Sequence, residues 1–172
     1  MRFCSIASGS SGNCIYVGSD NTHVLVDIGI SGKKMETGLN SLELTGRDLD
    51  GILITHEHSD HIKGLGVISR KYGIPIYATA GTVDAMVRTN ALGKIPEGIF
   101  HEIQEDEPFM INDLKVNPFT IPHDAAQPVG YRLEHEGHSV GIATDLGKYN
   151  DYIIGKQIMI FVCCRWVNIH II

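Results

Sequence analysis

Short apolar runs, rich in β-branched residues and bounded by turn residues, recur along most of the chain. Runs of this length and composition are typical of β-strands. Two longer stretches space their apolar residues as one face of a helix does. The pattern predicts strands at residues 2–7, 14–17, 23–28, 51–55, 76–78, 114–120, 130–134 and 139–143, and helices at residues 61–72 and 82–91.

The order of these elements indicates the fold class. Strands follow one another at the start of the chain, and helices lie between later strands. Such an order is typical of a mixed sheet covered by helices. We therefore expect an α/β (or α+β) fold, and 172 residues are enough for one domain with its own core.

The character of the chain changes near its end. Residues 158–172 read IMIFVCCRWVNIHII, which is almost entirely apolar and contains the single Trp and two of the four Cys. Charged and polar residues interrupt this apolar stretch, so a membrane anchor is not expected. We expect residues 1–157 to belong to one domain and residues 158–172 to be a tail foreign to it, as a truncation or a frame change would leave.

Composition and charge narrow the function classes. The chain is 43% hydrophobic and 20% charged, which is ordinary for a soluble protein. Its formal net charge of −6 argues against a broad basic face for nucleic acid. The cysteines have no CxxC spacing, and the N-terminus lacks the apolar segment of a secretion signal. These features predict a cytoplasmic protein with reduced thiols.

Three of the nine histidines lie close together in the stretch ITHEHSDHIKG, residues 54–64. His56 and His58 are two residues apart after an apolar strand, so they project to the same side and can share one metal ion. Asp60 and His61 lie where the chain turns into a helix, and they form a second pair of ligands. Imidazoles and carboxylates bind Zn, Mn or Fe, and a two-metal site needs carboxylates that can bridge. A solvated polar loop is the alternative interpretation.

Two further candidates lie later in the chain. His123 and Asp145 each follow a strand-like run, where loops gather into a site. Taken singly, His123 could be a surface or capping residue and Asp145 a turn residue. The HxHxDH motif favours metal ligation for both.

The turn SGSSGN, residues 8–13, is a candidate anion site. Its glycines permit a concave backbone, and Ser10, Ser11 and Asn13 could then contact a phosphate. The alternative is an ordinary hairpin turn.

Three stretches together resemble the metallo-β-lactamase superfamily. THEHSDH, residues 55–61, resembles its THxHxDH signature, and VLVDIG, residues 24–29, resembles the strand that precedes it. The opening SIASGSSGNCIYV, residues 5–17, is similar to the start of the YycJ/WalJ branch. The resemblance covers residues 1–157 and implies an αββα sandwich whose C-terminal half is missing from this chain.

The same resemblance implies roles for individual residues. His56, His58 and His123 would bind one metal, Asp60 and His61 the other, and Asp145 would bridge the two. Asp27 would orient the cluster without binding a metal. Asp60 is also the implied catalytic residue, because it would help to position the attacking hydroxide. The late histidine that completes the second metal site in the family has no counterpart here.

Members of this branch are exonucleases that degrade duplex DNA from the 5′ end, so the resemblance implies a metal-dependent phosphodiesterase with DNA as its substrate. Two divalent ions (Zn, Mn or Fe) would generate a metal-bound hydroxide and polarise a phosphoryl oxygen. Their charge would also attract phosphate to an acidic protein. Two alternatives stay open. One is a hydrolase of small esters, thioesters, lactones or cyclic phosphodiesters, and the other is a truncated metal-binding remnant without turnover. The oligomeric state is not predicted.

Overall fold

The structure is a computed structural model, and it describes residues 1–146 and residue 152. The predicted tail, residues 158–172, lies outside the described residues. Among the described residues, none of the helices has the length and apolar character needed to cross a membrane.

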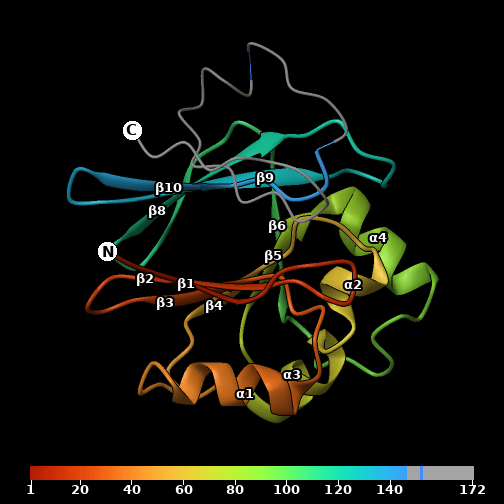
Figure 1. Cartoon of the computed structure of the whole chain (residues 1–172). Helices are drawn as coiled ribbons and strands as arrows, with labels where there is room; N and C mark the ends of the chain where they lie inside the picture. Colours follow the sequence, from red (N-terminus) through yellow and green to blue (C-terminus); the bar gives the residue numbers. More distant parts are fainter. Residues whose placement is uncertain (147–151, 153–172) are drawn as a thin grey trace.

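Two β-sheets face each other, and helices cover the outer face of the first (Figure 1). The first sheet is mixed: its first three strands are antiparallel, and the strands from β3 to β6 are parallel. Because the parallel strands run in one direction, their carboxyl ends meet at one edge of the sheet. In spatial order this sheet contains β1 (Arg2–Ala7), β2 (Cys14–Gly18), β3 (His23–Val26), β4 (Gly51–Leu53), β5 (Ile76–Thr79) and β6 (Phe100–Ile103).

The helices pack on the first sheet through apolar side chains. Met35 and Leu39 of α1 and Ile68 of α3 belong to one buried cluster with Leu25 and Ile52 of the sheet. Burial of each such side chain is worth about 1.5–3 kcal/mol relative to exposure in water, so this layer is a main source of stability. The helices are α1 (Gly32–Asn40), α2 (Ser59–Ile62), α3 (Leu65–Tyr72) and α4 (Ala80–Arg88).

The second sheet is fully antiparallel and packs against the opposite face of the first. Val24 and Val26 alternate with Leu25 along β3, so they face Val116 and Leu133 in a second buried cluster between the sheets. In spatial order this sheet contains β10 (His138–Ile142), β9 (Val129–His135), β8 (Leu114–Thr120) and β7 (Phe109–Ile111).

The expected α/β fold with two facing sheets is confirmed, and the predicted strands are all present with small shifts at their ends. The predicted helix at 61–72 is wrong in one respect, because it is two helices, α2 and α3, that break at Lys63 and Gly64. Gly64 lies against the carbonyl oxygen of Ile30, where a side chain would not fit. The sequence pattern also missed α1, β6 and β7.

A polar clasp ties the two sheets together at the end of β7. Asp113, in the turn between β7 and β8, accepts hydrogen bonds from the hydroxyl groups of Ser19 and Thr22 in the turn between β2 and β3. The Ser19 bonds measure 2.8 and 2.9 Å. These bonds lower the pKa of the Asp113 carboxyl below its usual value of 3.8.

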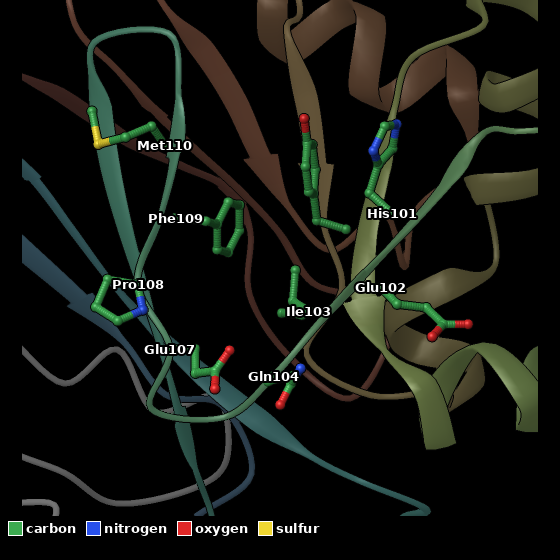
Figure 2. Close-up of a pocket in the computed structure, with 9 residues that line it drawn as sticks. His101, Glu102, Ile103, Gln104, Glu107, Pro108, Phe109 and Met110 are labelled. Carbon is green, nitrogen blue, oxygen red and sulfur yellow. The ribbon is translucent and has the colours of Figure 1, made fainter.

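A pocket of about 440 Å³ opens between the edge strands β6 and β7 (Figure 2). Its wall includes a stack of rings, in which Tyr77 lies between His101 and Phe109 with centroid separations of 5.0 and 5.3 Å. None of the candidate metal ligands lines this pocket.

Candidate metal centre

The HxHxDH motif follows β4 at the edge where the parallel strands of the first sheet end. The strand stops at Leu53, two residues earlier than predicted, and the backbone N–H of Ile54 still bonds to the carbonyl of Tyr77 at 2.9 Å. His56 and His58 therefore lie on a loop, whereas Asp60 and His61 lie on the short helix α2. His56 and His61 are fully buried, and His58 and Asp60 are half-buried.

The first group of potential ligands joins the two sheets. The donor atoms of His56, His58 and His123 all lie within 4.8 Å of one another. His123 comes from the loop between β8 and β9, and its Nε2 lies 3.2 Å from Nδ1 of His58. The structure therefore brings together the three histidines that the family resemblance assigns to one metal.

The second group contains His56, His61 and Asp145, again with donor atoms within 4.8 Å. Oδ2 of Asp145 lies 2.7 Å from Nε2 of His61 and 3.8 Å from Nε2 of His56. Asp60 is outside this group, although its Oδ2 lies 3.6 Å from Nε2 of His61. Asp145 thus lies closest to His61 within the second group, and its Oδ2 is 3.8 Å from Nε2 of His56, the histidine that both groups share.

Asp27 contacts His61 at Nδ1, the ring nitrogen that does not face Asp145. Its carboxylate accepts hydrogen bonds from the backbone N–H of Thr55 at 2.9 Å and from the Thr55 hydroxyl at 2.8 Å. Oδ2 of Asp27 also lies 2.7 Å from Nδ1 of His61. An Nδ1–H that donates to this carboxylate leaves Nε2 of His61 directed at Asp145, which is how ligand histidines are commonly oriented.

His56 is oriented in a similar way by Thr55. The Thr55 hydroxyl donates its proton to Asp27, so its oxygen can accept from Nδ1–H of His56, 3.0 Å away. Nε2 of His56 is then left with a lone pair, and it is buried without any hydrogen-bond partner. A buried polar atom without a partner costs about 1–3 kcal/mol. His56 belongs to both groups of potential metal ligands, and the free lone pair of its Nε2 can bind a metal ion.

The electrostatics of the two buried histidines differ. Burial lowers the pKa of His56 to about 2, and the neighbouring charges of His61, His123 and His58 act in the same direction. His56 is therefore neutral near pH 7, as a metal ligand must be. Burial also opposes charge on His61, but Asp27 and Asp145 outweigh it and raise the pKa of His61 to about 10. The carboxylates that favour a proton on His61 would equally favour a metal cation.

Asp27 and Asp145 also share an uncommon backbone conformation. Their φ angles are 62° and 57°, in the left-handed region that few residues other than glycine adopt. Asp tolerates this region better than most residues, and strained residues often cluster at functional sites. The two carboxylates that lie 2.7 Å from His61 are thus both presented by a residue with positive φ that follows a strand.

The three residues of the candidate phosphate turn differ in exposure. Ser10 and Ser11 are exposed, whereas Asn13 is only 1% exposed. Nδ2 of Asn13 lies 3.1 Å from Nε2 of His61, and the backbone N–H of Asn13 bonds to the carbonyl of Asp60 at 2.8 Å. The turn therefore packs against α2, and Asn13 supports His61, while phosphate contact by Ser10, Ser11 and Asn13 stays a prediction.

Three residues that contact the site, and one that supports the His123 loop from further away, were not singled out, or were given another role, from the sequence. They support or link the donor residues instead of belonging to either group. The signal for Thr55 was its place directly before the first histidine, and for Glu57 its place between two histidines. No sequence signal pointed to the other two. The four are Asn13, Thr55, Glu57 and Gln127.

Most of the chain matches one known protein family. Residues 22–162 match the family described as Beta-lactamase superfamily domain. This range includes each of the candidate metal ligands, from His56 to Asp145.

Two bacterial proteins are similar in sequence. The chain is 41% identical over 155 residues to "Exodeoxyribonuclease YycJ" of Bacillus anthracis, and 40% identical over 155 residues to "Exodeoxyribonuclease WalJ" of Streptococcus pneumoniae serotype 2. Each match covers 90% of this chain and 58% of the relative. The chain thus spans somewhat more than half the length of these curated relatives.

Solved structures with this fold have much lower sequence identity. Zn²⁺-bound PqqB from Methylobacterium extorquens superposes with a TM-score of 0.77 at 14% identity, covering 95% of this chain and 72% of that one. The metallo-β-lactamase fold protein YhfI from Bacillus subtilis superposes with a TM-score of 0.72 at 17% identity, and the match covers 90% of this chain and 65% of YhfI. The likeness shows a shared fold.

Proposed function

This chain belongs to the beta-lactamase superfamily, and from that membership we propose that it serves in metal-dependent hydrolysis of phosphodiester bonds in DNA, as a 5′–3′ exonuclease. The observation that carries the proposal is the buried Nε2 of His56, which has no hydrogen-bond partner and belongs to two groups of potential ligands. Relatives named exodeoxyribonucleases support DNA as the substrate.

The ligand sets would be divided between two divalent ions. His56, His58 and His123 would hold one ion, and His61 and Asp60 the other, with Asp145 between them. The donors are nitrogen and oxygen atoms, which suit Zn, Mn or Fe. When bound, such ions would act as Lewis acids, which would favour hydroxide over water near neutral pH and would stabilise negative charge on a phosphoryl group.

The protein residues would supply orientation and proton transfer. Asp27 and Thr55 fix the ring of His61, so its Nε2 stays directed at Asp145. The Asp60 side chain is 30% exposed beside that ring, so its Oδ2 can accept a proton from an attacking water and release it to solvent. Ser10 and Ser11 are exposed on the turn that packs against α2, which suits contact with a DNA phosphate.

A nuclease assay with the whole chain tests the proposal. We expect 5′-phosphorylated duplex DNA to be shortened from its 5′ end when Mn²⁺ or Zn²⁺ is supplied, and to remain intact with a chelator. The matched control is the double variant His56→Ala and His58→Ala, which should be inactive with either ion.

A parallel panel of small esters, thioesters, lactones and cyclic phosphodiesters separates the alternatives. If the chain binds metal and cleaves a small ester but not DNA, the nuclease assignment is wrong and the hydrolase class remains. Metal binding with no turnover of any substrate would instead favour a metal-binding domain without activity of its own.

A further inference from the structure

We propose that Gln127 is a positioning residue, which fixes the loop carrying His123 against the loop carrying His56 and His58. It would thereby set how the three histidines face one metal ion. This inference rests on the proposed metal-dependent function and adds a residue that contacts neither metal nor substrate.

The three histidines need such a support because they come from different sheets. His56 and His58 follow β4 of the first sheet, and His123 lies between β8 and β9 of the second. His123 is half-buried, and Nε2 of His123 contacts Nδ1 of His58 at 3.2 Å. As ligands of one metal ion both nitrogens would present lone pairs, and a hydrogen bond between them could not then hold the His123 loop in place, so contacts elsewhere in the loop would set its position.

Gln127 lies in the same loop, and its polar groups bind residues at or just after the ends of β5 and β6 in the first sheet. Its Oε1 accepts from the backbone N–H of Gly81 at 2.8 Å, and its Nε2 donates to Oε1 of Glu105 at 2.7 Å. Its backbone carbonyl accepts from the hydroxyl groups of Thr79 at 2.7 Å and Thr82 at 3.3 Å. One residue of the second sheet's loop therefore binds the junction between β5 and α4 at several points.

This contact replaces the usual cap of α4. The N-cap residue of α4, Thr79, makes no side-chain hydrogen bond to a backbone N–H of the helix, although its hydroxyl lies 3.0 Å from that of Thr82. Gly81 lies in the first turn of α4, where backbone N–H groups have no acceptor within the helix. The side chain of Gln127, from a distant part of the chain, supplies the acceptor for this N–H. The fit is close, because a Cβ on Gly81 would lie 2.8 Å from Cβ of Gln127.

The neighbours of Gln127 attach the same loop to the metal-binding motif. The backbone N–H of Ala126 donates to Oε1 of Glu57 at 2.8 Å, and Glu57 lies between His56 and His58 in sequence. The N–H of Val129 donates to the carbonyl of Thr55 at 3.0 Å. The loop is therefore held on both sides of Gln127, close to the histidines that it must face.

The chemistry of the side chain explains why a glutamine suits this position. An amide accepts at Oε1 and donates at Nε2 at the same time, so it serves both Gly81 and Glu105. A carboxylate could accept from Gly81 but would be repelled by Glu105. Alanine would serve neither contact.

The variants Gln127→Ala and Gln127→Glu test the inference, with Gln104→Ala as the matched control because Gln104 is exposed. Each protein is titrated with Co²⁺ while its visible absorption spectrum is recorded, and its thermal unfolding is measured without metal. A His123→Ala variant identifies the spectral band and affinity of the site to which His123 contributes. This readout is independent of nuclease activity.

We expect both Gln127 variants to fold, and to bind Co²⁺ about tenfold more weakly at the His123 site, which is the lower end of the effect of removing supporting residues around a metal. The site that contains His61 should change less than twofold, and Gln104→Ala should match the wild type. Equal weakening of both sites would make Gln127 a general structural residue, and unchanged binding would exclude any role. A wild-type chain that binds Co²⁺ without cleaving DNA would overturn the proposed function alone, whereas one that binds no Co²⁺ would overturn both.

Discussion

Oδ2 of Asp27 lies 2.7 Å from Nδ1 of His61, and both side chains are almost completely buried. The same carboxylate accepts two hydrogen bonds from Thr55, so it is itself held in place. Residues separated by more than thirty positions in sequence thus form one rigid unit behind the candidate metal centre.

The first prediction concerns this pair. Asp27→Asn should weaken metal binding at the His61 site by about 10- to 100-fold. The substitution removes the negative charge next to the His61 ring, and the new amide NH₂ cannot accept a hydrogen bond from Nδ1–H of His61 or from Thr55. Isothermal titration with Zn²⁺ measures the change. The exposed Asp84→Asn on α4 serves as the matched control. An affinity equal to that of the control would show that Asp27 does not orient His61.

A second prediction compares two histidines of the motif. His56 belongs to both donor groups and His58 to one. His56→Ala should therefore reduce binding at both sites, whereas His58→Ala should remove about one equivalent of metal and leave the other. Elemental analysis after gel filtration gives the stoichiometry. Identical losses in the two variants would contradict the shared role of His56.

Asp60 provides a test of mechanism. In a full-length relative, the variant that matches Asp60→Asn should keep its thermal unfolding midpoint, because the side chain is partly exposed. Its turnover of DNA should fall by about 100-fold or more, since an amide is a poorer ligand and a poor proton acceptor. Steady-state kinetics beside a thermal melt separates the two effects. Wild-type turnover would argue against a two-metal mechanism.

Gly29 offers a test of packing behind the motif. A Cβ at this position would overlap the carbonyl of Asp60 and lie 2.7 Å from the backbone N of Asn13. Gly29→Ala should destabilise the fold by about 3 kcal/mol, because backbone atoms cannot move aside as a flexible side chain does. In Gly32→Ala the nearest atom is Cδ1 of Ile68 at 3.0 Å, the mobile end of a side chain, so this control should change stability little. Urea unfolding measures the free energy of unfolding of both variants and of the wild type.

The polar clasp at Asp113 should make stability depend on acid pH. Because the folded state lowers the pKa of this carboxyl below 3.8, its stabilisation is present above that value. It is lost as the pH falls through the lower pKa of the folded state. Asp113→Asn should therefore lower the thermal unfolding midpoint at pH 7, and the difference from wild type should shrink below pH 4. A constant difference across this range would show that the carboxylate charge is not responsible.

The sequence predicted those parts of the fold and site that have a local signal. Strands β1, β8 and β9 came from short runs with apolar residues between turn residues, and the HxHxDH spacing is local because its residues are adjacent in the chain. Helix α1 was missed because only Met35 and Leu39 of its nine residues are buried, too few to give a clear period.

The supporting contacts could not be predicted because they depend on tertiary structure. Asn13 reads as a turn residue, and only the packing of the turn on α2 brings its amide to His61. Gln127 lies in an irregular loop, and its partners Thr79 and Glu105 come from distant parts of the chain. The break between α2 and α3 has a similar origin, because Gly64 is fixed by its contact with Ile30.

The division of the ligands between the two sheets couples metal binding to folding by mass action. His56 and His58 extend from the first sheet, and His123 and Asp145 from the second, so an unfolded chain does not hold the complete sets. An ion that binds only the folded chain adds about 2.7 kcal/mol to the free energy of unfolding at a concentration one hundred times its Kd. Bound metal would then act as a reversible cross-link between the sheets at the edge where their strands end, and removing it with a chelator would loosen one sheet from the other at this edge.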